Sequence, residues 1–227
     1  MPDSGVWPTT FEEARAVQEE LRQRVITRDE LGEVRTVAGI DAGYEGELAR
    51  AAVVVLSFPS LAPLDYAVAR RPATFPYVPG FLSFREVPAV LAAMEALRTK
   101  PDLLLCDGQG IAHPRRLGIA SHIGVLLDLP SIGCGKSRLT GRNKPVPDAR
   151  GAHVPLTDRG EVIGAVLRTR PGTRPLYISS GHRVSLETAL HYVMACTTRY
   201  RLPETTRAAD KLASDGIIPV IDRQLFR

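Results

Sequence analysis

Two apolar, strand-like segments of this 227-residue chain each carry an aspartate, and this pair constrains the fold more than any other feature. Asp41 lies inside the β-like run 34–41, and Asp107 directly follows the continuous apolar run 103–106. A carboxylate within or at the end of an apolar strand is costly unless a cation lies beside it. If the two strands lay side by side, both aspartates could share one bound cation.

A third acid, Glu86, begins an apolar helical segment between the two strands. The Ser83-to-Glu86 spacing is also that of a helix capping box, so a capping role and a metal-ligand role stay equally open. Pro88 indicates that the helix starts after Ser83, because proline fits best in a first turn. If all three acids met, their oxygens would form a cage suited to Mg²⁺ or Mn²⁺, as in a metal-dependent nuclease. The sequence leaves the number of ions open.

The order of the predicted elements indicates an α/β fold. Apolar spacing predicts helices at residues 10–28, 84–98, 117–127, 186–196 and 205–214, and strands at 36–44, 49–58, 65–70, 103–106, 131–134, 153–156, 162–168 and 176–179. Three antiparallel strands followed by helix, strand, helix and strand resemble a ribonuclease H-like mixed β-sheet flanked by helices. The first and fourth strands are neighbours in that topology. No linker divides the chain, so we expect residues 1–227 to form one domain, with about 1–9 and 217–227 peripheral.

Composition and charge exclude several classes of protein. The chain is 44% hydrophobic, and no apolar run approaches the ~18 residues of a membrane span. The first residues lack the pattern of a secretory signal, and three widely spaced cysteines form no Cys-x-x-Cys motif. We therefore expect a reduced, cytoplasmic protein without a membrane partner. The net charge is +4, and basic clusters at 115–116 and 136–144 flank the predicted acidic site, which favours a phosphate-rich substrate.

Three further features could carry chemistry. His113 precedes a proline, and it either shapes a turn or orders a water and moves a proton. Lys136 is either solvated or holds a phosphate or the attacking water as a point charge. The segment 76–82, Pro-Tyr-Val-Pro-Gly-Phe-Leu, either covers the core as a surface loop or forms a rigid wedge that enters a duplex where a base has left.

On these motifs the chain resembles the endonuclease V family of deoxyinosine-directed repair nucleases. The matching stretches are 37–41, 76–86, 107–115, 133–139, 181–186 and 200–207, and the resemblance covers about residues 10–215. It implies that Asp41, Glu86 and Asp107 bind Mg²⁺, with Mn²⁺ also supporting activity. It further implies that His113 and Lys136 assist catalysis.

The same resemblance implies a substrate site and a reaction. Tyr77 would belong to the wedge, and Pro79, Gly80, Leu82 and Gly108 would lie near an extruded hypoxanthine base. The family hydrolyses the second phosphodiester bond on the 3′ side of the lesion and leaves a 3′-hydroxyl and a 5′-phosphate. The resemblance therefore implies a DNA repair endonuclease that uses metal-activated water on DNA containing deoxyinosine. We expect it to act as a monomer.

Two other classes of function, a different nuclease and a non-enzymatic nucleic-acid-binding module, stay open. An inosine-directed ribonuclease, or another RNase H-like structure-specific nuclease, would keep the acids and change the substrate, so RNA containing inosine is an alternative partner. A non-enzymatic nucleic-acid-binding module is opposed by the intact acids together with His113 and Lys136. Asp210 falls near another polar site position of the family, but a solvated helix face is the preferred interpretation. The pair Cys134-Gly135 departs from the family pattern and is expected to loosen the loop of Lys136.

Overall fold

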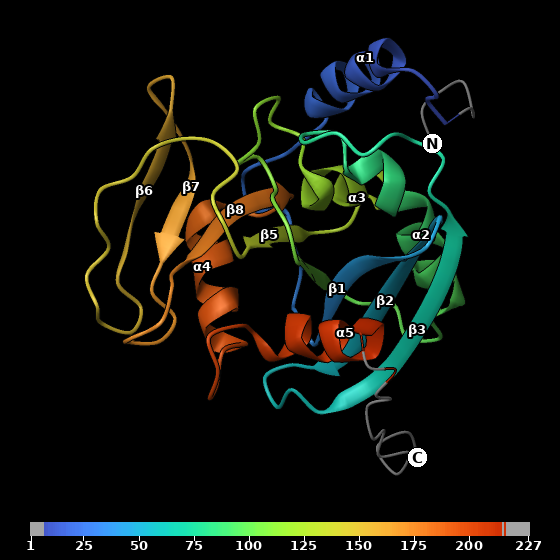
Figure 1. Ribbon diagram of the computed structural model, residues 1–227. Helices are drawn as coiled ribbons and strands as arrows, with labels where there is room; N and C mark the ends of the chain where they lie inside the picture. Colours follow the sequence, from blue (N-terminus) through green and yellow to red (C-terminus); the bar gives the residue numbers. More distant parts are fainter. Residues whose placement is uncertain (1–6, 215, 217–227) are drawn as a thin grey trace.

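Eight strands form one mixed sheet in the computed structural model, which describes residues 7–214 and 216 (Figure 1). The strands are β1 (Thr36–Glu45), β2 (Leu48–Ser57), β3 (Pro63–Pro72), β4 (Leu103–Cys106), β5 (Ser131–Gly135), β6 (His153–Asp158), β7 (Glu161–Leu167) and β8 (Leu176–His182). Their order across the sheet is β3-β2-β1-β4-β5-β8-β7-β6. The predicted meander of β1, β2 and β3 is confirmed, and β4 runs parallel to both β1 and β5.

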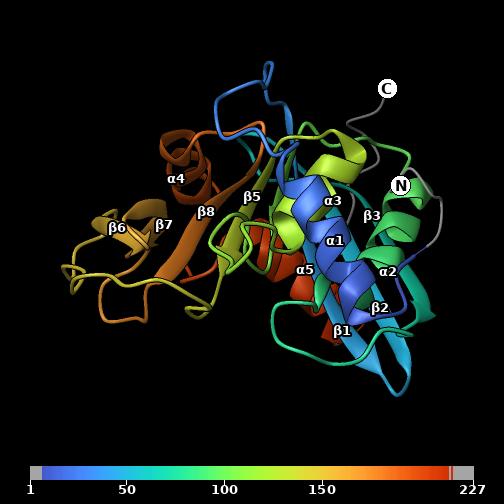
Figure 2. The same cartoon turned by 90° about the horizontal axis from the view of Figure 1, so that it is seen from above.

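Helices cover both faces of this sheet, so the predicted α/β class is confirmed. They are α1 (Phe11–Arg22), α2 (Ser83–Ala96), α3 (Ile119–Leu127), α4 (Leu186–Ala195) and α5 (Glu204–Ser214). Side chains alternate along a strand. Leu104 therefore packs towards α2 and α3, whereas Leu103 and Leu105 pack towards α4 and α5. Seen from above, α1 lies over α3, where Leu21 and Val125 share a small apolar cluster (Figure 2). Within the described ranges, no helix has the length and apolar character that a bilayer crossing requires.

The first helix ends earlier than its apolar spacing predicts. Thr10 caps it as expected, but the helix stops at Arg22 instead of residue 28. The backbone that follows bonds to the end of β8 instead of continuing the helix: the amide of Arg183, the residue after that strand, donates to the carbonyl of Ile26 at 2.6 Å. Val25 therefore keeps its apolar contacts outside any helix. The predicted peripheral segment 217–227 lies outside the described residues, as do residues 1–6.

The start of α2 shows how a proline is accommodated inside a helix. The predicted start after Ser83 is wrong, because Ser83 is the first helical residue and Pro88 lies within the helix. Proline has no N–H, so the carbonyl four residues earlier loses its helical donor. That carbonyl belongs to Phe84, and the indole N–H of Trp7 donates to it at 2.7 Å. Trp7, expected to be peripheral, also stacks on His122 with ring centroids 5.7 Å apart.

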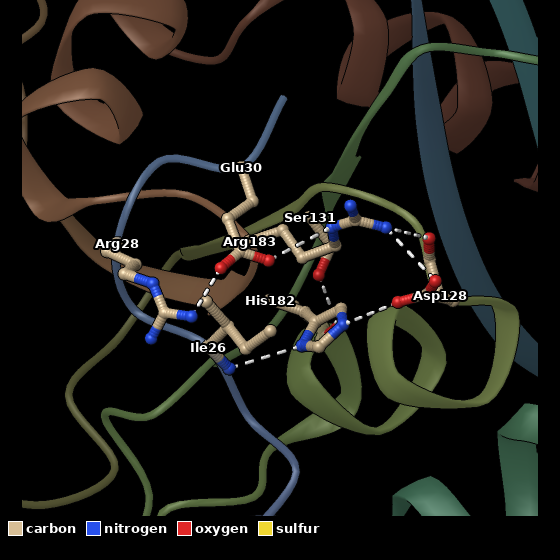
Figure 3. A network of polar contacts seen from close by, with 8 residues as sticks. Ile26, Arg28, Glu30, Asp128, Ser131, His182 and Arg183 are labelled. Atoms are coloured by element: carbon tan, nitrogen blue, oxygen red, sulfur yellow. Dashed lines mark hydrogen bonds and ion pairs between the residues drawn. The ribbon is translucent and has the colours of Figure 1, made fainter. Parts of the chain in front are cut away.

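A polar network fixes the linker between α1 and β1 (Figure 3). The amide of Ile26 donates to Nδ1 of His182 at 3.3 Å, so the proton of this ring lies on Nε2, 3.2 Å from a carboxylate oxygen of Asp128. Arg183 binds the other oxygen of Asp128 at 3.0 Å and lies 3.8 Å from Glu30. These contacts tie the linker to the ends of β8 and α3, and they hold the chain that follows α1 in place.

Candidate active site

Three aspartates converge where β1 and β4 run side by side. Ile40 of β1 pairs with Cys106 of β4, so the following residues, Asp41 and Asp107, lie at the same level of the sheet. This confirms the predicted neighbourhood of the two strands. Asp210 joins them from α5, and one carboxylate oxygen from each of the three lies within 4.8 Å of the others.

Asp210 reaches the site because α5 packs unusually close to β1. A Cβ at Gly39 would lie 1.9 Å from the carbonyl oxygen of Thr205, so only glycine allows this approach. Thr206 and Ala213 are buried on the inner side of α5, and Asp210 lies four residues after one and three before the other. The expectation that Asp210 lies on a solvated helix face is therefore wrong, although 47% of its side chain stays exposed. That spacing was the sequence signal for its position.

Glu86 lies in the same cavity but outside the tight aspartate group. Its carboxylate accepts a hydrogen bond from the hydroxyl of Tyr44 at 3.0 Å. The capping-box interpretation is wrong, because the Ser83 side chain makes no cap and instead lies 3.1 Å from Nδ1 of His122. Burial raises the pKa of Glu86 to about 7, against the lowering effect of the Tyr44 hydrogen bond. Because Glu86 lines the same cavity as the aspartates, its carboxyl group can serve as an oxygen ligand beside them.

The aspartate group carries more negative charge than its surroundings balance. Burial and the charge of Asp107 raise the pKa of Asp41 to about 7, and the positive charge of Lys136 only partly opposes this. Clustered carboxylate oxygens of this kind are the donors that hard divalent cations such as Mg²⁺ and Mn²⁺ bind. The donor set therefore fits a divalent metal held by Asp41, Asp107 and Asp210, with Glu86 in reach of the same cavity.

This crowding predicts a pH-dependent effect of Asp41→Asn on the metal-free protein. The folded-state pKa of Asp41 lies above its ordinary value of 3.8, so its contribution to stability is complete below that pH and is lost as the pH rises through about 7. In EDTA at about pH 8, Asp41→Asn should raise the free energy of unfolding by on the order of 2 kcal/mol, roughly 4–8 °C in Tm. Near pH 4 the gain should vanish. Thermal unfolding at both pH values measures it, and equal Tm differences at the two pH values would show that ionisation of Asp41 is not the cause.

Lys136 supplies positive charge at the edge of the aspartate group. Its Nζ lies 2.5 Å from Oδ2 of Asp107 and 3.4 Å from Oδ1 of Asp210. Burial alone would lower the pKa of Lys136, but the hydrogen bond and charge of Asp107, with Asp210 and Asp41, raise it overall. The ammonium group therefore stays charged, and it lies half-exposed at the cavity where it can reach an anionic group.

The loop that carries Lys136 is held on both sides. Arg201 donates to the carbonyl of Lys136 at 3.0 Å, and the amide of Gln109 donates to the carbonyl of Ser137 at 2.9 Å. A Cβ at Gly135 would lie 2.3 Å from Nε2 of Gln109, so this glycine leaves the room that the Gln109 amide occupies. The loosening expected from the Cys134-Gly135 pair stays a prediction.

His113 is engaged at both ring nitrogens. Nε2 lies 3.1 Å from the carbonyl oxygen of Gly80, and Nδ1 accepts the amide N–H of Arg115 at 3.2 Å. Burial and then the charge of Arg115 lower the pKa of His113 to about 4, so the ring is neutral with its proton on Nε2. This arrangement favours a role for His113 in holding the backbone at Gly80 and disfavours a role in moving a proton.

One cavity of about 620 Å³ contains the whole predicted site. Its lining includes Asp41, Tyr77, Pro79, Gly80, Leu82, Glu86, Asp107, Gly108, His113 and Lys136. Tyr77 is 66% exposed at the rim, and Gly80 has a left-handed φ of +83° that favours glycine. The sequence missed other lining residues, among them Ser83, Gln109, Ser137 and Asp210. A second, mainly apolar cavity of about 840 Å³ beside α4 contains none of the predicted residues.

Comparisons with known proteins agree along most of the chain. The family model described as Endonuclease V matches residues 19–211. The chain is 69% identical to Endonuclease V of Roseiflexus sp. (strain RS-1), with 94% of this chain and 96% of the relative covered. The crystal structure of Endonuclease V from Streptomyces avermitilis has 46% identity and a TM-score of 0.89, with 94% and 95% covered. Ciona intestinalis Endonuclease V, solved with a 24mer DNA containing an inosine followed by a ribo-adenosine, has 31% identity and a TM-score of 0.76, with 90% and 96% covered.

Proposed function

Because this chain belongs to the endonuclease V family, we propose that it is a metal-dependent DNA repair endonuclease that cuts DNA near deoxyinosine. The observation that carries the proposal is the group of Asp41, Asp107 and Asp210, whose oxygens lie within 4.8 Å of one another beside Lys136. The Ciona relative bound to DNA containing inosine supports the substrate.

The carboxylates give the site its proposed chemistry. Asp41 and Asp107, with Asp210 and Glu86 in the same cavity, would hold Mg²⁺ or Mn²⁺. The ion would supply Lewis-acid activation of water and stabilisation of the leaving oxygen. Lys136 would bind a non-bridging phosphate oxygen as a point charge and so orient the backbone of the substrate. The proposed reaction is hydrolysis of the second phosphodiester bond 3′ to the lesion, which leaves a 3′-hydroxyl and a 5′-phosphate.

Backbone groups would read the lesion. Hypoxanthine differs from adenine by an acceptor at position six and a donor at N1, and from guanine by the missing two-amino group. Amides and carbonyls of segments 77–82 and 107–110, which border the cavity, suffice to sense these differences. A weak inosine pair also lowers the cost of extruding the base. The exposed ring of Tyr77 would stack where the base has left.

Cleavage of an end-labelled duplex with one deoxyinosine tests the proposal. With Mg²⁺ we expect a single nick, and we expect no cleavage with EDTA or of the same duplex with adenine in place of hypoxanthine. Equal cutting of both duplexes would leave a nuclease of different specificity. No cutting of either would contradict the proposed function.

RNA containing inosine is the second candidate substrate. The DNA bound to the Ciona relative has a ribo-adenosine after the inosine, so a 2′-hydroxyl fits beside the lesion in that protein. Matched DNA and RNA strands with one inosine each, cut side by side, decide which substrate this chain prefers. A faster rate on RNA would favour the ribonuclease alternative.

A further inference from the structure

Three side-chain donors converge on one backbone carbonyl of the loop that borders the cavity. The carbonyl oxygen of Gly80 lies 2.9 Å from Nε2 of Gln18, 3.1 Å from Nε2 of His113 and 2.7 Å from Nη2 of Arg115. A carbonyl oxygen has two lone pairs, so two donors would satisfy it, and here three are in reach. The contacts therefore fix the orientation of the peptide between Gly80 and Phe81.

Gln18 is the least expected of these donors, because it comes from α1, far from the loop in sequence. Its side chain is fully buried, and its Oε1 accepts a hydrogen bond from Nε of Arg115. The guanidinium of Arg115 lies 4.1 Å from the ring centroid of Phe81. Gln18 and Arg115 thus orient one another, and both point at the carbonyl of Gly80. Ala14, one turn earlier in α1, packs in the same apolar cluster as Phe81.

We infer that Gln18 is a positioning residue for the substrate loop 77–82. It orders this loop before substrate binds, by donating to Gly80 and by holding Arg115 in place to do the same. Gly80, at φ +83°, has no Cβ to restrict its backbone, so ordering it in advance reduces the conformational entropy lost when substrate binds. The inference rests on the proposed function only in taking DNA as the substrate that this loop contacts.

Two substitutions separate this role from simple anchoring of α1. Gln18→Met removes both the donor and the acceptor, whereas Gln18→Glu keeps the acceptor for Arg115 and removes the donor to Gly80. Single-turnover cleavage of the deoxyinosine duplex should show a half-saturating enzyme concentration raised about tenfold in both variants, with the maximal rate changed less than about threefold. Glu20→Met, an exposed position on the same helix, should match wild type. If Gln18 only anchors Arg115, Gln18→Glu should bind substrate as wild type does, and that result would overturn the inference.

Hydrogen exchange without DNA tests the loop independently of activity. Peptides covering residues 76–84 should exchange faster in both Gln18 variants than in wild type and in Glu20→Met. Unchanged exchange in both Gln18 variants would overturn the inference. Faster exchange, in a protein whose wild type does not cut deoxyinosine duplexes, would leave the positioning role standing and contradict the proposed function alone.

Discussion

Asp41→Asn is expected to slow Mg²⁺-dependent cleavage of a deoxyinosine duplex by at least about 1,000-fold. Asparagine keeps the shape of the side chain, but it removes a carboxylate from a group whose oxygens lie within 4.8 Å of one another. Hard cations bind carboxylates through charge, so the neutral amide is a much weaker ligand. The loss of several kcal/mol of stabilisation in the transition state gives a factor of this size. Single-turnover rates with enzyme in excess measure it.

The stability of the same variant is its internal control. Asp41→Asn should unfold at a higher temperature than wild type in EDTA at about pH 8, because burial and the charge of Asp107 disfavour the ionised Asp41. Asp148→Asn, an aspartate that does not line the cavity, should cut at the wild-type rate. Lost cleavage with a higher Tm identifies a ligand and excludes a folding defect. Cleavage by Asp41→Asn at the wild-type rate would show that the metal assignment is wrong.

Lys136→Met is expected to lower the cleavage rate about 100-fold. Methionine fills similar space without charge, and the substitution removes the ammonium group that lies 2.5 Å from Asp107. Arginine should restore only part of the rate, because its planar fork does not reproduce a compact point charge. Single-turnover cleavage of the deoxyinosine duplex by wild type and both variants measures the effect. A wild-type rate for Lys136→Met would exclude Lys136 from the reaction.

Titration with a metal ion distinguishes the loss of cleavage in Lys136→Met from the loss in Asp41→Asn. Lys136→Met should bind Mn²⁺ at least as tightly as wild type, because the ammonium group no longer competes for Asp107. Asp41→Asn should bind Mn²⁺ more weakly. The electron paramagnetic resonance signal of free Mn²⁺ measures the binding of the ion by both variants. Weakened binding in Lys136→Met would mean that the lysine supports the site structurally instead of acting on the substrate.

The central part of the site could be predicted because local patterns encode it. The apolar run 103–106 predicts a strand buried on both faces, and an aspartate directly after it lies at the carboxyl end of the strand, where α/β sheets bind ligands. The pairing of Ile40 with Cys106 then brings Asp41 and Asp107 together. The positions of these residues follow from strand order, which the resemblance of the predicted elements to a ribonuclease H-like sheet implied.

The residues that the sequence missed depend on contacts between distant segments. Asp210 enters the site because Gly39 lets α5 approach β1, and the spacing within α5 marks only its inner face, not the strand against which that face packs. The start of α2 depends on Trp7, which supplies the donor that Pro88 lacks. Gln18 looks like any polar helix position, since its partners Gly80 and Arg115 lie far along the chain.

Mapping of the nick at single-nucleotide resolution, with wild type and Asp107→Asn side by side, tests the central claim most directly. The duplex carries one deoxyinosine and a label at either end of the damaged strand. Wild type with Mg²⁺ should give one nick at the second phosphodiester bond 3′ to the lesion, and Asp107→Asn should give none. Cuts placed without regard to the deoxyinosine, or an equal nick by Asp107→Asn, would contradict the proposed role of the aspartate group.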